Sequence, residues 1–379
     1  MNALHNLLAQ VNFSELIVHL QTLSWQQIVM MLVGCGLIYL AIAKEYEPLL
    51  LAPVGFGCIL ANIPGSNAVG PGGWLTLLQQ AGITTELFPV LIFVAVGAMC
   101  DFTPLLAMPS MMFFGAAAQF GIFLTIVVAT LLGFDLKEAA SIGIIGAADG
   151  PTTIFVATRF APRLLGPLTV CAYTYMSLVP IIQPPVIRMM TTKRERQIRM
   201  VYDGGRPVSK MARILFPVAV TIVAGLVVPA SVALIGALMF GNLIRESGVM
   251  DKLSKAAQGE LANIVTLLLG ITIGATMDAK VFLTLQTLGI LSLGLAAFIF
   301  DTIGGVLFAK VLNLFLKQKV NPMLGAAGIS AFPMSARVIA KMAQKEDPGN
   351  YLIMHAVGAN VAGQIASIMA GGLILALVR

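Results

Sequence analysis

Apolar residues in this chain gather in long runs, and glycine and proline interrupt these runs more often than charged residues do. Charged side chains are absent from residues 48–85, 102–134, 214–244 and 348–378. Each of these stretches exceeds the roughly 20 residues with which a helix crosses a bilayer. The pattern predicts an all-α polytopic membrane protein whose apolar segments fall into two groups.

The composition strengthens this prediction. Hydrophobic residues make up 58% and charged residues 11% of the 379 positions, whereas soluble domains carry about 25% charged residues. Soluble enzyme folds are therefore excluded. We expect an N-terminal interfacial segment over 1–25, a first membrane repeat over 26–186, a linker over 187–210 and a second membrane repeat over 211–379. Leu4, Leu7 and Leu8 share one face of an amphipathic helix in the first of these segments.

The net charge of +6 comes from one short region. Residues 188–213 hold eight basic and two acidic side chains, so this stretch alone accounts for the whole excess. A basic loop between membrane helices is typical of the cytoplasmic side. A docking surface for an acidic or lipid partner is the alternative interpretation. Nucleic acid is not an expected partner.

Short motifs of the first half recur in the second half in the same order. The offsets between matching residues are 177, 182 and 180 positions. The matched pairs are Asp101 with Asp278, Gly143 with Gly325, and Asn62 with Asn242. Repeats with glycine and proline breaks in matching segments are typical of transporters in which discontinuous helices meet near the bilayer midplane. We expect two inverted repeats and an elevator-like movement of one bundle against a fixed scaffold.

Asp149 is the acidic residue with the clearest functional context. It precedes Gly150 and Pro151, which disrupt a helix, and Thr152 adds a hydroxyl beside the freed backbone groups. Carboxylate, hydroxyl and carbonyl oxygens suit a hard cation such as Na⁺. The alternative is a buried, protonated aspartate with a structural role. Asp101 and Asp278, which end apolar segments, are secondary candidates that could equally cap a following helix.

The second half carries a matching break without the acid. Ala331 stands where Asp149 stands in the first half, and Ser330, Pro333 and Ser335 surround it. Arg337 follows about one turn beyond Pro333 and could bind a carboxylate through two parallel hydrogen bonds. A snorkelling arginine at the membrane interface is the alternative.

A second polar face is expected in the last apolar run. Asn360 and Gln364 are four residues apart, so they lie on one side of a helix in a stretch without formal charge. A buried asparagine there requires partners, and a cation is a suitable one.

At these residues the sequence resembles the membrane-embedded beta subunits of the biotin-dependent, sodium-pumping decarboxylases of oxaloacetate, methylmalonyl-CoA and glutaconyl-CoA. The likeness covers essentially the whole chain. The most specific motif is residues 146–152 around Asp149. The spacing of Asn321, Gly325, Ser330 and Arg337 and the tyrosines before Pro180 also match.

The resemblance implies an enzyme that decarboxylates carboxybiotin, consumes a proton and exports Na⁺ across a bacterial inner membrane. It implies a carboxyltransferase (alpha) subunit, a biotin carrier domain and a small gamma or delta subunit as partners, in a complex where the chain itself forms a homo-oligomer. Carboxybiotin would be a substrate held by a partner.

The resemblance and the residue patterns together assign roles to individual positions. The catalytic candidates are Asp149, Tyr175 and Arg337. The Na⁺ candidates are Asp149, Asn360, Asn321, Ser330, Gly150 and Thr152, with Asp149 and Asn360 as the principal ligands. The carboxybiotin candidates are Arg337, Ser330 and Ser335, and Asn242, Asp101 and Asp278 are secondary candidates.

The buried acid suggests how such a pump could work. A carboxylate in a medium of low dielectric constant resists carrying an uncompensated charge, so either Na⁺ or a proton must neutralise it. The proton could then pass to the ureido nitrogen of biotin. The competing hypothesis is a sodium-coupled secondary transporter of a small carboxylate with the same repeat architecture. A passive membrane anchor for a soluble complex would explain the basic linker but not the buried acid.

Overall fold

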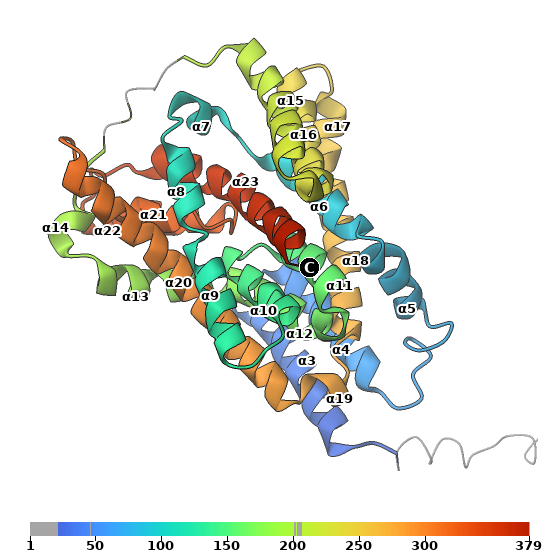
Figure 1. The fold of residues 1–379 in the computed structure, drawn as a ribbon. Coiled ribbons are helices and arrows are strands. Elements are labelled where there is room, and N and C mark those ends of the chain that lie inside the picture. The colour runs from blue at the N-terminus through green and yellow to red at the C-terminus, as the bar shows by residue number, and fades with distance from the viewer. Residues whose placement is uncertain (1–21, 46, 201, 203–206, 379) are drawn as a thin grey trace, which may run out of the picture.

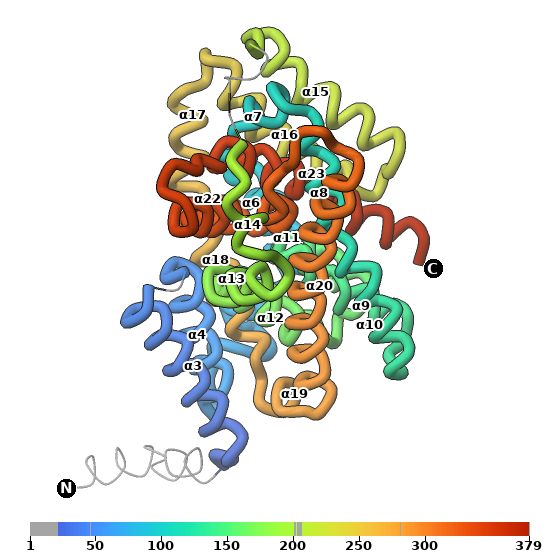
Figure 2. Tube along the Cα trace, turned by 90° about the vertical axis from the view of Figure 1, so that its left-hand side faces the viewer, coloured from blue at the N-terminus to red at the C-terminus, as the bar shows by residue number. Residues whose placement is uncertain are grey.

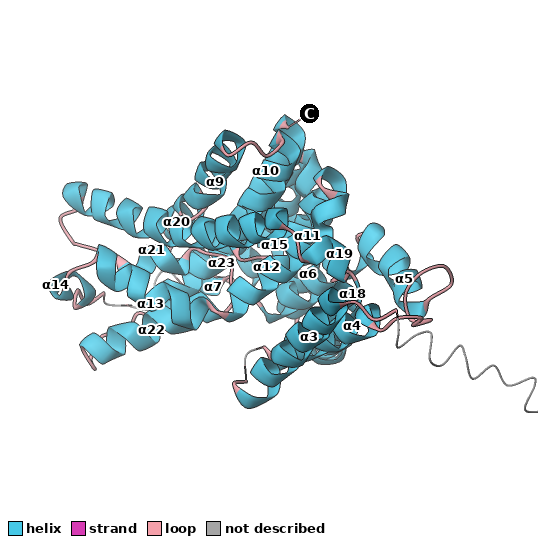
Figure 3. Ribbon diagram, turned by 90° about the horizontal axis from the view of Figure 1, so that it is seen from below, coloured by secondary structure: helices cyan, strands magenta, loops and turns pink. Residues whose placement is uncertain are grey.

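The computed structural model describes residues 22–378 except 46, 201 and 203–206. All regular secondary structure in this part of the chain is helical (Figure 3). The predicted interfacial helix of the N-terminal segment lies outside the described residues. Ser24 opens the described part by capping α3, since its hydroxyl accepts a hydrogen bond from the backbone amide of Gln27.

Thirteen elements in the described part of the first half precede the bend at Leu178. Their order alternates long apolar helices with short broken pieces. They are α3 (Trp25–Ala43), α4 (Pro48–Asn62), α5 (Trp74–Leu78), the π-helical turn η1 (Gln79–Thr84), α6 (Leu87–Met99), α7 (Thr103–Ala107), α8 (Met111–Ala117), α9 (Phe120–Leu131), α10 (Leu136–Gly143), the 3₁₀ turn η2 (Ile144–Ala147), α11 (Gly150–Phe160), the 3₁₀ turn η3 (Pro162–Leu164) and α12 (Leu165–Ser177).

The rest of the chain follows a similar order. After α13 (Val179–Met190) comes the basic linker with the short helix α14 (Lys193–Arg196). The second half contains α15 (Lys210–Val227), η4 (Pro229–Ser231), α16 (Val232–Ser247), α17 (Asp251–Ala256), the π-helical turn η5 (Ala257–Leu261), α18 (Ala262–Ala275), α19 (Ala279–Phe282), α20 (Leu285–Phe315), α21 (Met323–Ala327), α22 (Met334–Glu346) and α23 (Ile353–Leu377).

The length and apolar character of the helices confirm the predicted membrane class. Among the described residues, six helical stretches are long and apolar enough to cross a bilayer, and the number rises to eight if each of two bent pairs is one span. The bends are 61° between Trp74–Thr84 and Leu87–Met99, and 69° between Pro162–Ser177 and Val179–Met190.

The helices form two packed groups. The helices α3, α4, α6, α15, α16 and α18 pack on one another, and α15, α16, α6 and α18 line the right-hand side of Figure 1. The remaining group comprises α7 to α13 and α20 to α23. It contains the two segments that are interrupted at Asp149 and at Ser330, and the long helix α20 runs along it (Figure 2). Because the broken segments lie in the second group, that group contains the candidate site.

Contacts in the first group join the two halves of the chain crosswise. Helix α4 packs on α18, and α6 packs on α16. The buried amide of Asn62 donates to the carbonyl of Met277 at 2.8 Å, and that of Asn242 donates to the carbonyl of Cys100 at 3.0 Å. Each asparagine therefore holds the turn that follows a helix of the opposite half. These matched bonds support the proposal of an internal duplication, whose inverted orientation stays a prediction.

The acids of the repeated motif lie at these turns. Asp278 caps α19 by accepting from the backbone amide of Lys280 at 2.9 Å, and Asp101 accepts from that of Thr103 at 2.9 Å. Arg245 also lies 3.6 Å from the Asp101 carboxylate. Asp278 is thus the N-cap of α19, whereas Asp101 bonds the first amide of α7 from the residue before its N-cap. Asn242 lies beside Asp101, since it bonds the carbonyl of Cys100.

The crossing of α6 and α16 depends on backbones in close contact. A Cβ atom on Gly97 would lie 1.8 Å from the carbonyl oxygen of Leu238, so no side chain fits there. We expect Gly97→Leu to destabilise the protein by at least about 1–3 kcal/mol, because the helices must move apart. Thermal unfolding in detergent would measure this as a lower Tm. Gly36→Leu is the control, since nothing lies within 4 Å of a Cβ atom there. Equal unfolding temperatures for the two variants would contradict the expectation.

Candidate functional site

The first broken segment, from α10 to α11, is interrupted at Asp149. Helix α10 tightens into η2, and Ala148 then adopts a left-handed conformation with φ of 51°. Asp149 has extended backbone angles and caps α11, which begins at Gly150 and Pro151. Proline at this position is compatible with a helix start because it lacks an amide that the first turn would leave unbonded. The local sequence therefore places a carboxylate at the gap between two short helices.

The second broken segment meets the first. Helix α21 ends at Ala327, and α22 begins at Met334, so the intervening residues are not helical. The Ser330 hydroxyl donates a 2.7 Å hydrogen bond to the carbonyl of Ala147, two residues before Asp149. Ser330 and Asp149 also line the same cavity. The two gaps are therefore adjacent inside the second helix group.

One face of α23 contacts both gaps. Asn360, Gln364 and Ser367 are spaced by about one turn each, and all three are buried. The Ser367 hydroxyl donates to Asp149 Oδ2 at 3.0 Å, and the Gln364 amide donates to the carbonyl of Ser330. Sequence reasoning identified Asn360 and Gln364 but missed Ser367. The same helical spacing, extended by one turn, was the available signal.

The Asn360 side chain bonds backbone groups at the break between α21 and α22. Its Nδ2 donates to the carbonyls of Ala327 and Ile329 at 3.1 and 2.7 Å, and it lies 3.2 Å from the Ser335 hydroxyl. Its Oδ1 is buried and has no hydrogen-bond partner in the described residues. Asn360 lies seven residues before Ser367, which is about 10 Å along a helix. It therefore approaches the break at Ser330 rather than the Asp149 carboxylate.

The Asp149 carboxylate is buried among hydroxyl groups. Its Oδ2 accepts from the hydroxyl of Thr152 at 2.6 Å and from that of Ser367 at 3.0 Å. Asp149 is 5% exposed and takes part in none of the ion pairs found among the described residues. Because burial of an unpaired charge is costly, this carboxylate requires a cation or a proton.

A cavity of about 150 Å³ adjoins the carboxylate. It reaches from Asp149 to Glu47, which precedes α4, so both helix groups contribute to its wall. Its lining includes Glu47, Leu50, Ile92, Phe93, Val96, Ala148, Asp149, Pro151, Tyr173, Met176, Thr266, Ser330, Phe332 and Gln364. The carboxylate is thus accessible to a small ion or to the head of a ligand rather than enclosed by protein on every side.

The tyrosine beside Asp149 is Tyr173. A Cβ atom on Gly150 would lie 2.2 Å from Cζ of Tyr173, so its ring rests on the backbone next to the acid. The Tyr173 hydroxyl is buried and without a hydrogen-bond partner among the described residues. The expected residue, Tyr175, instead donates from its hydroxyl to the carbonyl of Leu291 on α20 at 2.5 Å. The structure does not bring Tyr175 to Asp149.

Arg337 lies at the surface on the first turn of α22 and does not contact Asp149. It takes part in none of the ion pairs of the described chain. Burial raises the pKa of Glu47, and the Arg337 guanidinium acts in the opposite direction, so the two side chains are within electrostatic reach. Arg337 is not among the residues that line the cavity, and its guanidinium has no ion-pair partner in the described part of the chain.

Asn321 lies away from the acid. It precedes α21, and its side chain bonds the linker rather than the Asp149 gap. Ser335, expected at the carboxybiotin site, donates to the carbonyl of Ile329 at 3.1 Å and so supports the second gap from within. Asp301, another acid in an apolar run, accepts from the backbone amide of Ile122 at 3.1 Å where α9 begins.

Comparison with known proteins identifies relatives along the whole chain. The family described as "Na+-transporting oxaloacetate decarboxylase beta subunit" matches residues 26–378. The glutaconyl-CoA decarboxylase subunit beta of Acidaminococcus fermentans is 53% identical, over 94% of both chains. The methylmalonyl-CoA decarboxylase subunit beta of Veillonella parvula is 52% identical, over 92% of both. The oxaloacetate decarboxylase beta chain 2 of Salmonella typhi is 45% identical, over 92% of this chain and 94% of its own.

These matches confirm the resemblance drawn from the motifs. They cover both broken segments, the basic linker and the polar face of α23, and they include relatives named for three different decarboxylases. The chain belongs to the family of beta subunits of the Na⁺-transporting decarboxylases.

Proposed function

We propose that this chain decarboxylates carboxybiotin presented by a biotin carrier domain and uses the Asp149 gap to couple that reaction to Na⁺ export. The observation that supports the proposal best is the Asp149 carboxylate, which is buried, bonded by two hydroxyls and without a basic partner among the described residues. Decarboxylation supplies free energy and consumes a proton, so a group that alternates between Na⁺ and a proton can link the two processes.

The oxygen atoms around Asp149 suit Na⁺ as the transported ion. The carboxylate and the hydroxyls of Thr152 and Ser367 converge on one point, and hard cations favour oxygen ligands. Gly150 contributes to the Asp149 site by allowing the helix break there rather than by a side-chain ligand. The free Oδ1 of Asn360 is a further oxygen near Ser330, so we assign it to the neighbouring gap rather than to the ion at Asp149.

The proton chemistry follows from the same site. When carboxybiotin loses carbon dioxide, the bond between the ureido nitrogen and the carboxyl carbon breaks and its electron pair stays on nitrogen. A proton must then bond to that nitrogen. The proton that replaces Na⁺ on Asp149 is the source. We assign the relay to Tyr173, which lines the same cavity and whose buried hydroxyl has no hydrogen-bond partner among the described residues. Tyr175 then acts through its bond to α20 rather than by proton transfer.

The assembly is also part of the proposal. We infer a carboxyltransferase subunit, a biotin carrier domain and a small membrane subunit as partners, since the relatives are named as subunits of decarboxylases. The basic linker lies on the cytoplasmic side, where the soluble partners are. Several copies of this chain assemble in a bacterial inner membrane.

A measurement on vesicles separates this function from that of a sodium-coupled carboxylate carrier. Carboxybiotin added to vesicles that contain the purified chain should lose carbon dioxide faster than with empty vesicles, and Na⁺ should change the rate. A carrier would instead move a carboxylate with Na⁺ and leave carboxybiotin intact. Carboxylate uptake without any effect on carboxybiotin would therefore favour the carrier.

Arg337 provides a test of the anion site. We expect Arg337→Ala to raise the carboxybiotin concentration for half-maximal rate by about tenfold or more, because a charge-assisted hydrogen bond contributes about 1.5–3 kcal/mol. The initial rate of decarboxylation against carboxybiotin concentration gives this value. Lys341→Ala, an exposed cation one turn further along α22, is the matched control. An unchanged half-saturating concentration in Arg337→Ala would assign the arginine to the membrane interface instead.

A further inference from the structure

The two ends of the second broken segment lie on the same short stretch of the linker. We call residues 196–200 the strap. The carbonyl of Ile198 in the strap accepts hydrogen bonds from the side-chain amides of Asn321, at 2.9 Å, and Asn350, at 3.1 Å. Asn321 precedes α21, and Asn350 follows the end of α22. One backbone group of the strap therefore joins the start of the broken segment to its end, while Ser330 lies between them.

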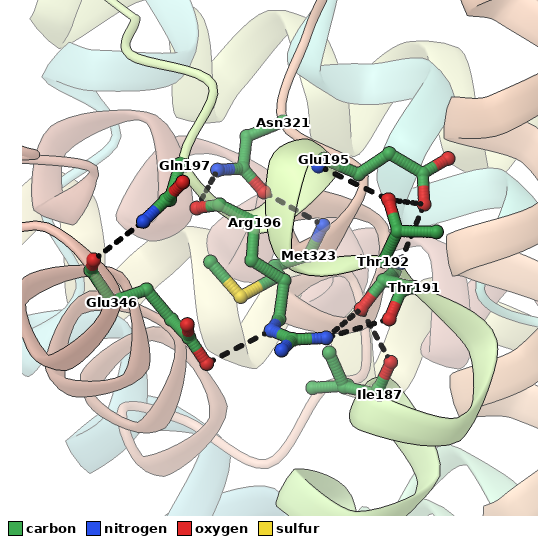
Figure 4. A network of polar contacts seen from close by, with 9 residues as sticks. All are labelled: Ile187, Thr191, Thr192, Glu195, Arg196, Gln197, Asn321, Met323 and Glu346. Atoms are coloured by element: carbon green, nitrogen blue, oxygen red, sulfur yellow. Dashed lines mark hydrogen bonds and ion pairs between the residues drawn. The ribbon is translucent and has the colours of Figure 1, made fainter.

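The amide of Asn321 is fully engaged in this connection, and Figure 4 shows its bonds to Arg196 and Met323. Its Nδ2 donates to the carbonyls of Arg196 and Ile198 at 2.8 and 2.9 Å, and its Oδ1 accepts from the backbone amide of Met323 at 3.1 Å. The residue is completely buried. Because both donors and the oxygen already have partners, the side chain is oriented towards the strap and the first turn of α21.

Ion pairs hold the strap to the end of α22. The Arg196 guanidinium bonds the Glu346 carboxylate at 2.9 Å and the carbonyl of Thr191 at 2.6 Å, as Figure 4 shows. Arg199 bonds Asp347 through two nitrogen atoms, at 2.6 and 2.9 Å, and holds the pKa of that carboxyl below its ordinary value. The strap is thus fastened independently of Asn321 at the far end of the broken segment.

The short helix α21 can carry a displacement from Asn321 to Ser330. It has only five residues, all buried. A Cβ atom on Gly325 would lie 1.9 Å from the carbonyl of Gly305, so α21 lies directly against α20. The Gln183 amide also donates to the carbonyl of Ala326 at 2.9 Å. A close-packed element of this kind moves as a unit, since the packing leaves little room for internal adjustment.

We propose that Asn321 is a positioning residue of the Asp149 site: it fastens the strap to α21 and thereby holds the Ser330 hydroxyl on the carbonyl of Ala147. This assignment replaces the expectation that Asn321 is a Na⁺ ligand. The assignment of Asn321 rests on the proposed function only in the experiments that measure Na⁺ dependence. The contacts of the strap do not depend on which ion or ligand the Asp149 site binds.

Two substitutions at Asn321 distinguish a positioning residue from a ligand. Asn321→Ala removes the three bonds, and Asn321→Asp keeps an oxygen but loses both donors and places a negative charge beside two carbonyls. We expect both variants to raise the half-saturating Na⁺ concentration for decarboxylation by about tenfold, since a lost buried hydrogen bond costs about 1–3 kcal/mol. An Asp variant with wild-type or lower Na⁺ requirement, beside an impaired Ala variant, would make Asn321 a ligand and overturn the proposal.

A second measurement needs neither Na⁺ nor carboxybiotin. Trypsin cleaves after the basic residues of 193–199, and mass spectrometry of the purified full-length protein gives the rate at each bond. We expect about tenfold faster cleavage in both Asn321 variants, because loosening the strap raises the population of the open linker. Unchanged cleavage in folded Asn321→Ala would overturn the proposal. Suppose that the Asn321 variants are cleaved faster, but decarboxylation by the wild-type protein shows no Na⁺ dependence. This result would contradict the proposed function and still support the role of Asn321 in fastening the strap.

Asn350→Ala extends the test to a residue outside α21. It removes the other amide that bonds the Ile198 carbonyl, so we expect faster linker cleavage and a raised Na⁺ requirement, both smaller than in Asn321→Ala. This variant also decides the matter if the Asn321 variants do not accumulate in folded form. Wild-type cleavage and wild-type Na⁺ dependence in Asn350→Ala would then count against the strap.

Discussion

Replacing Asp149 by asparagine should abolish Na⁺ transport and carboxybiotin decarboxylation together. Asparagine fills the same space and can still accept hydrogen bonds from Thr152 and Ser367, but it carries no charge and cannot take up the proton. With Na⁺ as the proposed partner of the carboxylate, the substitution removes one member of a buried charge pair, which costs about 2–5 kcal/mol. This cost corresponds to a fall of about 30-fold or more in either rate. Uptake of radioactive Na⁺ by inverted vesicles and carbon dioxide release measure the two rates.

The matched control for Asp149→Asn is Asp301→Asn. Asp301 is an equally buried acid whose Oδ1 accepts from the backbone amide of Ile122, and asparagine can preserve that bond. We expect this control to retain coupled activity. Na⁺-stimulated decarboxylation in folded Asp149→Asn would remove the acid from the role of ion carrier.

Loss of the Asn360 side chain should have the second largest effect. Asn360→Ala leaves the buried carbonyls of Ala327 and Ile329 without the amide that now bonds them. Each unsatisfied buried group costs about 1–3 kcal/mol, so the gap around Ser330 should open or shift. We expect the half-saturating Na⁺ concentration to rise by about tenfold or more, as measured from the Na⁺ dependence of decarboxylation.

Asn62→Ala is the matched control for Asn360→Ala. Asn62 is another completely buried asparagine whose amide bonds backbone carbonyls, but it joins α4 to the turn after α18. Its loss should lower thermal stability and leave the Na⁺ requirement unchanged. An unaltered Na⁺ dependence in Asn360→Ala would take Asn360 out of the site.

Local rules explain why some of the site could be predicted from sequence. Gly150 and Pro151 favour a helix that starts anew after Asp149 over one that continues through it, so the break there follows from the local sequence. Helical spacing likewise places Asn360 and Gln364 on one face. The all-helical membrane class follows from uncharged runs that are longer than a bilayer requires.

Other parts of the site depend on long-range contacts. Tyr173 and Tyr175 are two residues apart and so point to different sides of α12, and the sequence does not show which side faces Asp149. Asn321 bonds a carbonyl 125 residues away in the linker, a pairing that no local pattern indicates. Ser367 is a single hydroxyl in an apolar helix, and only the packing of α23 against the first gap reveals its partner.

We propose that Na⁺ and a proton compete for the Asp149 carboxylate. The half-saturating Na⁺ concentration for decarboxylation in reconstituted vesicles, measured as a function of pH, tests it most directly. Competition for one group predicts that the Na⁺ requirement rises as the pH falls, by up to about tenfold per pH unit once the protonated acid predominates. A Na⁺ requirement that does not change over the pH range in which the protein stays folded and active would contradict the account.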